Sequence, residues 1–211
     1  MSSRTFAIIR YALFAMVAGG LIVLIVNAPK PSSLPAAANL PKEFGTVPPF
    51  ALTERDGRTI TEKDLAGRVA VVGFIFTRCH ESCPMVTGVM AQLRQELPSD
   101  VQFISISVDP RYDKPEVLRQ YASNFKADPE RWWFLTGERD PVYSLIRDGF
   151  KVGVAENPDP KRLPGELVSH TTRLAVVDGQ GHLRGYFDTR DPAAIDLLKR
   201  KVGALRDEEN P

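Results

Sequence analysis

The sequence predicts an α/β domain, with a central mixed sheet flanked by helices, behind an N-terminal membrane-anchoring segment. Residues 69–76 are a nearly continuous apolar run, the pattern of a strand buried on both faces, and residues 101–108 predict a second buried strand. Each run is followed by a segment whose apolar side chains recur at helical spacing. A hairpin pattern with a glycine-rich turn and a final helix complete the chain, an order of elements that is typical of layered α/β domains.

Length and composition limit the class of protein. The 211 residues suffice for one domain with an appendage, and 43% hydrophobic with 25% charged residues is ordinary for a globular protein. The 27 basic and 26 acidic side chains give a net charge of +1, which argues against nucleic-acid binding through phosphate neutralisation. Two cysteines exclude a disulfide scaffold and a four-cysteine zinc site, but they allow one redox pair or part of one metal site.

The N-terminus carries an uncharged apolar run, residues 11–26, preceded by Arg4 and Arg10. Basic residues before such a run predict that the N-terminus stays in the cytoplasm and that the domain is exported. The alternative to a retained anchor is a cleaved signal peptide, with cleavage among the small residues at 35–38. Those residues lie far beyond the end of the run, which favours retention. We therefore expect residues 1–29 to anchor the protein once in the inner membrane, with its domain facing the periplasm.

Residues 30–49 are rich in proline and predict an extended spacer, so we expect the domain to span residues 50–211. Its first elements are a hairpin over residues 50–60 with an Asp-Gly turn, and then one capped helical turn that ends at Gly67. The segments 84–97 and 115–125 each begin with a proline, which suits the first turn of a helix.

The later elements follow from similar signals. Residues 132–135 predict a short strand, with one of its two tryptophans facing the core and the other facing solvent. A short helix is expected over residues 141–149, and residues 167–177 and 182–187 form a hairpin around an Asp-Gly-Gln-Gly turn. Asp191 caps the last helix. Parallel strands joined by a helix and closed by an antiparallel hairpin fit a thioredoxin-like layout.

The chemistry concentrates where the first buried strand ends. Cys79 and Cys83 lie between that strand and the helix expected at 84–97. If this helix begins slightly earlier, near Ser82, both sulfurs can converge at its N-terminus. The unpaired main-chain N–H groups and the helix dipole there favour the thiolate form. Thiolates attack disulfides and bind soft metals. The spacing differs from the C-x-x-C of thioredoxin-type oxidoreductases, and Thr77 stands too close to Cys79 for a peroxiredoxin. Two structural cysteines or an inert disulfide are the alternative.

Four blocks of the sequence, in order, resemble the SCO/SenC family of copper chaperones. They are the Phe-Thr-x-Cys-x-x-x-Cys-Pro loop at 76–84, the strand with Asp-Pro and a later Asp at 104–115, the Leu-Thr-Gly segment within 133–137, and the Val-Ser-His-Thr-Thr segment at 168–172. Together they cover about residues 45–206. An N-terminal anchor is also usual in the family.

The resemblance implies a thioredoxin-like fold that binds one copper ion and matures the copper centre of cytochrome c oxidase. Carried over to this sequence, the ligands would be Cys79, Cys83 and His170. Two thiolates and an imidazole suit Cu(I), whereas zinc would want a fourth ligand. Family members commonly carry Pro and an acid between the cysteines, where this chain has His80, Glu81 and Ser82.

Several neighbouring residues have weaker claims to a role. His80 adjoins a ligand and is expected to influence copper only from outside the ligand set. Asp109 ends a strand at the edge where α/β proteins bind ligands, although a turn or helix-cap role is the alternative for both Asp109 and Asp113. Met85 and Met90 could be soft ligands, but core packing is the expectation for both.

We expect a membrane-anchored copper metallochaperone, and not an enzyme with turnover. It would carry Cu(I), or Cu(II), to the copper-receiving subunit of cytochrome c oxidase, and it would exchange with other periplasmic copper chaperones or thiol reductants. Cys79 and Cys83 are also expected to form a reversible disulfide in an oxidising compartment. The alternative function is a thiol–disulfide oxidoreductase that reduces cysteines of the oxidase subunit or of other exported proteins.

Overall fold

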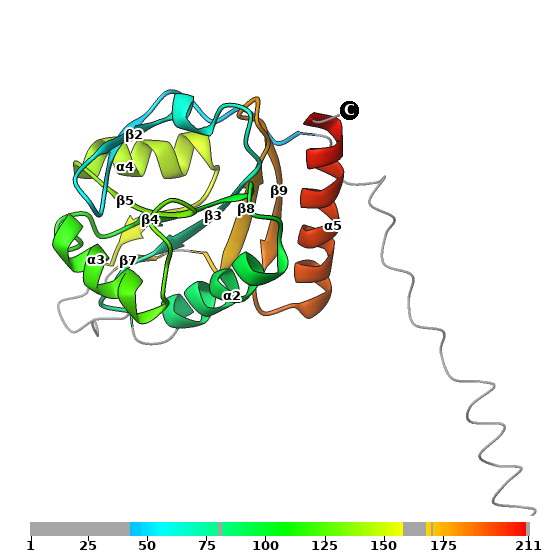
Figure 1. Cartoon of the computed structure of the whole chain (residues 1–211). Coiled ribbons are helices and arrows are strands. Elements are labelled where there is room, and N and C mark those ends of the chain that lie inside the picture. The colour runs from blue at the N-terminus through cyan, green and yellow to red at the C-terminus, as the bar shows by residue number, and fades with distance from the viewer. Residues whose placement is uncertain (1–42, 80–81, 158–167, 170, 210–211) are drawn as a thin grey trace, which may run out of the picture. The chain divides into compact units, whose positions relative to one another are not determined.

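The computed structural model describes residues 43–79, 82–157, 168–169 and 171–209 (Figure 1). All of them belong to the second of the two units into which the chain divides, residues 40–211. The expected membrane anchor, residues 1–29, lies outside the described residues, as does most of the proline-rich spacer. Among the described residues, no helix has the length and apolar character that crossing a membrane requires.

A seven-stranded mixed sheet forms the centre of the described unit, in the order β2-β1-β5-β4-β3-β8-β9. Its middle strands run parallel: β3 (Ala70–Ile75), β4 (Gln102–Ser107) and β5 (Trp132–Thr136). Antiparallel strands flank them: β1 (Ala51–Glu54) and β2 (Thr59–Thr61) beyond β5, and β8 (Arg173–Val177) and β9 (Leu183–Asp188) beyond β3. The three parallel strands are buried along their whole length, which explains the continuous apolar sequence of β3 and the mostly apolar sequence of β5, whereas β4 also buries Gln102, Ser105 and Ser107.

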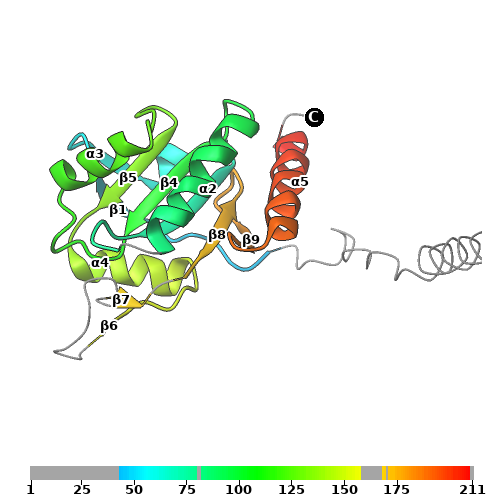
Figure 2. The same ribbon diagram turned by 90° about the horizontal axis from the view of Figure 1, so that it is seen from below.

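Helices cover both faces of this sheet. On one face lie α2 (Ser82–Glu96), α3 (Pro115–Asn124) and α5 (Pro192–Glu209), and on the other lies α4 (Arg139–Ser144), continued by a π-helical turn over Leu145–Gly149 (Figures 1 and 2). Because α2 and α3 join neighbouring parallel strands, right-handed crossovers place both on the same face. An ion pair between Lys199 and Glu96 joins α5 to α2. The observed fold is the predicted α/β thioredoxin-like arrangement.

The first hairpin and the helical turn after it are confirmed. Thr61 caps η2 (Glu62–Leu65) through a reciprocal exchange with Asp64, and Gly67 has a φ of +73°, which glycine adopts without strain. The chain before β1 also packs on the domain, because Phe44 donates a main-chain hydrogen bond to Leu183 and Val47 donates one to Gly181.

Three expectations about individual segments are wrong. Both tryptophans of β5 are buried, since β5 lies inside the sheet with helices on both faces. Met90 is buried as expected, but Met85 is 37% exposed because it points away from the sheet in the first turn of α2. The strand predicted over residues 167–177 is interrupted: β7 (Val168–Ser169) pairs with β6 (Ala155–Glu156) in a separate ribbon, and β8 begins only at Arg173.

Candidate copper and dithiol site

The two cysteines lie where β3 ends and α2 begins. Cys79 follows the strand, and Cys83 belongs to the first turn of the helix, which starts at Ser82. Since β3, β4 and β5 are parallel, their carboxyl ends share this edge of the sheet, and ligands of α/β proteins commonly bind there. The local geometry that the spacing of the cysteines predicted is therefore present.

Main-chain N–H groups hold both sulfur atoms in place. Both cysteine side chains are buried, with Cys79 4% and Cys83 0% exposed. The N–H of Cys83 donates to the Sγ of Cys79 at 3.4 Å, and the N–H of Phe76 donates to the Sγ of Cys83, also at 3.4 Å. The Sγ of Cys79 also lies 3.5 Å from the Oγ of Ser82. This arrangement presents two adjacent soft donors at the start of a helix, which fits a soft metal or a disulfide.

The neighbouring sulfur of Cys79 and burial both disfavour the thiolate form of Cys83. A hydrogen bond to Cys79, together with burial, raises the pKa of the Cys83 thiol far above its ordinary value, and the N–H of Phe76 only partly opposes this effect. Cys83 therefore keeps its proton at neutral pH and shares it with Cys79. A metal that binds both sulfurs must displace this proton, so metal binding is coupled to proton release.

A buried carboxylate fixes the loop before Cys79. Asp113, which is fully buried, accepts hydrogen bonds from the N–H of Thr77 at 3.1 Å and from the hydroxyl of Ser107 at 2.6 Å. Burial raises the pKa of this carboxyl group. Asp113 does not cap α3, whose N-cap is Lys114; its contacts instead join the end of β4 to the loop that carries the first cysteine.

Asp109 contacts the residue that precedes Cys79. Its Oδ2 accepts hydrogen bonds from the Nε and Nη2 of Arg78, at 3.1 and 2.5 Å, and its N–H donates to the Oγ of Ser107 at 3.0 Å. The guanidinium of Arg78 also stacks on the ring of Tyr112, 4.4 Å from its centroid. Asp109 therefore lies at the cysteine edge as expected, and there it orients Arg78.

Sequence reasoning missed a hydroxyl pair behind Cys83. The hydroxyl of Thr87 donates to the carbonyl of Cys83 at 2.8 Å, and the hydroxyl of Tyr121 lies 2.9 Å from it. Because the single proton of Thr87 is already used, Tyr121 must donate to Thr87. Burial raises the pKa of Tyr121, which is consistent with a hydroxyl that keeps its proton. The only sequence signal was the spacing of four residues from Cys83 to Thr87.

Of the three histidines, the structure describes only His182. His80 and His170 lie outside the described residues, and among the residues that are described no group of three His, Cys, Asp or Glu side chains could hold a metal. His182 follows the turn after β8, with its Nδ1 3.3 Å from Asp178. Val177, at the end of β8, pairs with Ala70, at the start of β3, so His182 lies at the edge of the sheet opposite the cysteines.

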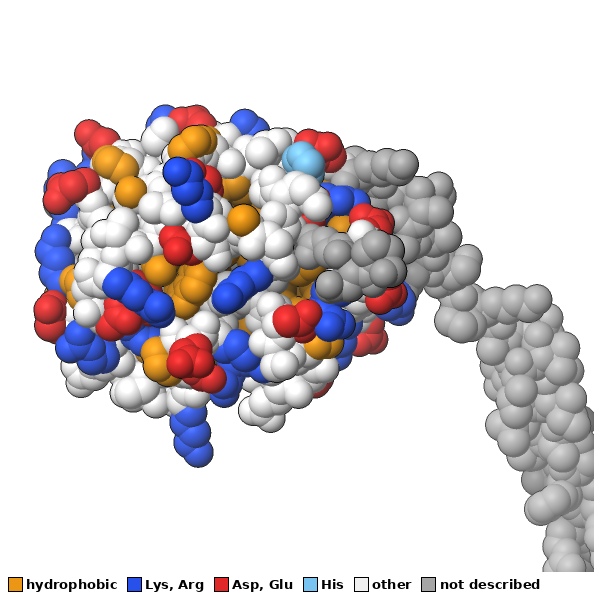
Figure 3. Space-filling view, turned by 45° about the horizontal axis from the view of Figure 1, so that its top comes forward, with side chains coloured by type: hydrophobic (Ala, Val, Ile, Leu, Met, Phe, Trp, Pro, Cys, Tyr) orange, Lys and Arg blue, Asp and Glu red, His pale blue; other side chains and the backbone are white. Residues whose placement is uncertain are grey.

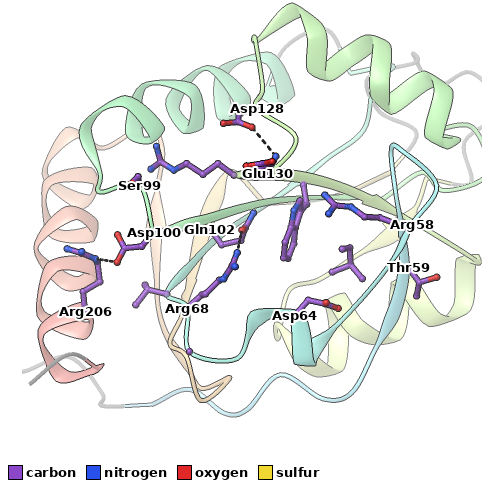
Figure 4. Close-up of a pocket in the computed structure, with 15 residues that line it drawn as sticks. Arg58, Thr59, Asp64, Arg68, Ser99, Asp100, Gln102, Asp128, Glu130 and Arg206 are labelled. Carbon is purple, nitrogen blue, oxygen red and sulfur yellow. Dashed lines mark hydrogen bonds and ion pairs between the residues drawn. The ribbon is translucent and has the colours of Figure 1, made fainter.

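A hollow of about 960 Å³ opens at that opposite edge, between the first hairpin, α5 and the amino ends of the parallel strands (Figure 4). Basic and acidic side chains line it together, among them Arg58, Asp64 and the ion pair of Asp100 with Arg206. Figure 3 shows the same mixture of charges around exposed apolar atoms on the face that carries β2. The hollow contains neither cysteine.

The fold and the cysteine pair together define an α/β thioredoxin-like protein with a C-x-x-x-C dithiol at a strand-to-helix junction. The chain belongs to the SCO1/SenC family, whose family model matches residues 39–202.

Similar proteins agree with this assignment. The SCO1 protein homolog of Bacillus subtilis is 40% identical over 157 residues, which cover 72% of this chain and 79% of the relative. The structure of BsSco, described as a member of the Sco family of cytochrome c oxidase assembly proteins with a disulfide switch, is 27% identical, covers 78% of this chain and 96% of its own, and has a TM-score of 0.67. The structure of Bradyrhizobium japonicum ScoI with copper bound is 26% identical, covers 72% and 98%, and has a TM-score of 0.57.

Proposed function

We propose that this protein is a metallochaperone that binds one copper ion and delivers it to the copper centre of cytochrome c oxidase. The observation that carries the proposal is the adjacency of two buried cysteine sulfurs at the carboxyl edge of β3. Two thiolates are a donor set that favours Cu(I), and copper is the metal that the copper-bound Sco structure supports. Delivery would proceed by exchange of one thiolate at a time with thiolates of the receiving protein.

We assign His170 as the third ligand. In the sequence it stands between the end of β7 at Ser169 and the start of β8 at Arg173. Because β8 runs antiparallel to β3, with Ala175 opposite Val72, β8 begins at the edge of the sheet where β3 ends and Cys79 follows. The topology of the described strands therefore supports an imidazole from this segment as a partner for the two sulfurs.

Replacement of each histidine by alanine tests the ligand set. Cu(I) affinity, measured anaerobically against a competing chelator, should fall by well over the ~10-fold of an outer-shell change when His170 is lost. His182→Ala is the matched control, because His182 lies at the opposite edge of the sheet, and it should leave the affinity unchanged. His80→Ala should have at most a small effect. A silent His170→Ala together with a damaging His80→Ala would show that the ligand assignment is wrong.

A thiol–disulfide oxidoreductase is the second candidate function, in which Cys79 and Cys83 reduce cysteines of the oxidase subunit or of other exported proteins. The two adjacent thiols support it, as does the disulfide switch described for BsSco. A disulfide lacks the thiolate charge that a ligand needs, so oxidation should abolish Cu(I) binding. Alkylation of the protein before and after reduction tests whether the reversible disulfide forms. Undiminished Cu(I) binding by the oxidised form would contradict the prediction that oxidation excludes copper.

We further propose that residues 1–29 anchor the protein in the inner membrane and that its domain faces the periplasm. Arg4 and Arg10 before the apolar run support this orientation. Mass spectrometry of the membrane-extracted protein should find the intact N-terminus, whereas a mature N-terminus near Asn39 would indicate cleavage. Protease added to intact spheroplasts should digest the domain; digestion only after lysis would contradict export.

A further inference from the structure

The exposed large apolar side chains of the described residues gather near the cysteines. They are Met85, which is 37% exposed, and Tyr112, which is 48% exposed. Met85 lies in the first turn of α2, two residues after Cys83, and Tyr112 packs against Arg78, the residue before Cys79. Single exposed apolar residues need no explanation, but two that approach the same reactive pair from different elements mark an interaction surface.

Tyr112 is held in place although half of it is exposed. The guanidinium of Arg78 lies 4.4 Å from the centroid of its ring, and Asp109 accepts two hydrogen bonds from that guanidinium. The ring therefore has little conformational freedom to lose when a partner covers it. Tyrosine and arginine side chains that are ordered before binding are typical anchors of protein interfaces.

A basic hollow continues this surface beyond Tyr112. It has a volume of about 380 Å³, and three basic side chains, those of Arg111, Lys114 and Arg139, line it together with the acidic Glu138 and Asp140. Arg139, on its far side, pairs with Asp140 at 3.0 Å, whereas Arg111 and Lys114 form no ion pair with any other described residue. Arg111 and Lys114 outnumber Glu138, so the hollow has a net positive charge beside an exposed aromatic ring. Such a surface fits a segment that brings a carboxylate next to an apolar side chain.

We propose that Met85, Tyr112, Arg111 and Lys114 form the docking surface for the protein that exchanges copper with Cys79 and Cys83. This partner would present an acidic segment beside its own thiolates, with an apolar side chain against Tyr112 and a carboxylate in the basic hollow. The proposal rests on the proposed function, because it assigns the surface to the protein that receives the copper. Docking there would bring the partner's sulfur atoms to Cys79, since Arg78 joins Tyr112 to the cysteine loop.

Copper transfer from the full-length protein, copper-loaded and in detergent, provides the test. The probe is the purified, reduced, copper-free domain of the cytochrome c oxidase subunit that carries the receiving copper site. The second-order rate of transfer should fall at least tenfold for Tyr112→Ala and for Arg111→Glu, and it should stay within about twofold of wild type for Tyr112→Phe. Arg68→Glu is the matched control, because Arg68 lines the hollow at the opposite edge and undergoes the same change of charge. It should transfer copper at the wild-type rate.

Met85 needs a variant that separates docking from copper binding. Met85→Leu keeps an apolar side chain without the sulfur and should transfer normally, whereas Met85→Gln should be slow. All variants should retain wild-type Cu(I) affinity in chelator competition.

The outcomes distinguish a failure of the docking surface from a failure of the proposed copper-delivery function. If the wild-type protein transfers no copper, the proposed function fails and the docking surface fails with it. If the wild type transfers copper and Tyr112→Ala and Arg111→Glu match its rate, the docking surface is wrong while the proposed function stands. A loss of Cu(I) affinity in Tyr112→Ala would assign Tyr112 to the metal site instead and would also overturn the docking surface.

Discussion

Asp113 accepts hydrogen bonds from both the main-chain N–H and the hydroxyl of Thr77, at 3.1 and 2.5 Å, two residues before Cys79. A third hydrogen bond to the same carboxylate comes from Ser107, at the end of β4. One buried acid therefore ties the cysteine loop to the neighbouring strand, and the position of the first sulfur depends on a residue far from it in the sequence.

Replacement of Asp113 by alanine should reduce both stability and order at the site. The change leaves the N–H of Thr77 and the hydroxyl of Ser107 without their buried partner, which should lower the free energy of unfolding by about 2–4 kcal/mol. Denaturant unfolding of the reduced protein measures the loss. Asp140→Ala is the control, because Asp140 is exposed and its pairing with Arg139 should contribute less than about 0.5 kcal/mol. An equal loss of unfolding free energy in the two variants would show that the buried contacts of Asp113 do not stabilise the fold more than an exposed ion pair does.

Two glycines should respond in opposite directions to the same substitution. A Cβ at Gly73, in β3, would lie 2.7 Å from the Sδ of Met90 and 3.2 Å from Leu174, so Gly73→Ala should destabilise the fold by about 1–3 kcal/mol. A Cβ at Gly88, inside α2, meets no atom within 4 Å, and Gly88→Ala should stabilise the helix by about 0.5–1 kcal/mol. Urea midpoints of the two variants test the pair, and a shift of both in the same direction would contradict the packing of β3 against α2.

The layers of the fold and the position of the cysteines could be predicted because local patterns determine them. The run that became β3 is apolar without interruption, and the segment that became β4 is mostly apolar, a pattern typical of strands buried on both faces. The start of α2 at Ser82 follows from the proline after Cys83, and that start places both sulfurs at one helix end.

The contacts around the cysteines could not be predicted, because they depend on the order and register of the strands. Asp113 reaches Thr77 only because β4 lies beside β3, with Ser107 opposite Ile75. The pattern of apolar residues in the sequence does not specify this pairing register. The burial of both tryptophans likewise depends on the position of β5 inside the sheet, and the exposure of Met85 depends on the rotation of α2 about its axis.

The two thiols should react in a fixed order. Cys83 is fully buried, and its hydrogen bond to Cys79 raises the pKa of its thiol, so it is a poor nucleophile in the reduced protein. Cys79 is slightly exposed and accepts the N–H of Cys83 at its sulfur. Partial alkylation with iodoacetamide, followed by peptide mass spectrometry, should therefore find the label first on Cys79. Preferential labelling of Cys83 would contradict this assignment of the attacking thiol.

The affinity for Cu(I) should rise with pH across the neutral range. The hydrogen bond to Cys79 and burial both raise the pKa of Cys83, so this thiol is protonated in the metal-free protein at pH 7. Binding of Cu(I) to both sulfurs releases the proton, and a higher pH lowers the free-energy cost of that release. The apparent affinity should increase by about tenfold per pH unit for each proton displaced.

Chelator competition at pH 6, 7 and 8 measures this slope, and calorimetry in two buffers of different ionisation enthalpy counts the protons directly. Cys83→Ser is the matched variant: it keeps the size of the side chain but removes the titrating thiol, so the slope should fall by one proton as the affinity drops. A pH-independent affinity of the wild-type protein would contradict a Cys83 that is protonated before copper binds. An unchanged slope in Cys83→Ser would assign the released proton to another group.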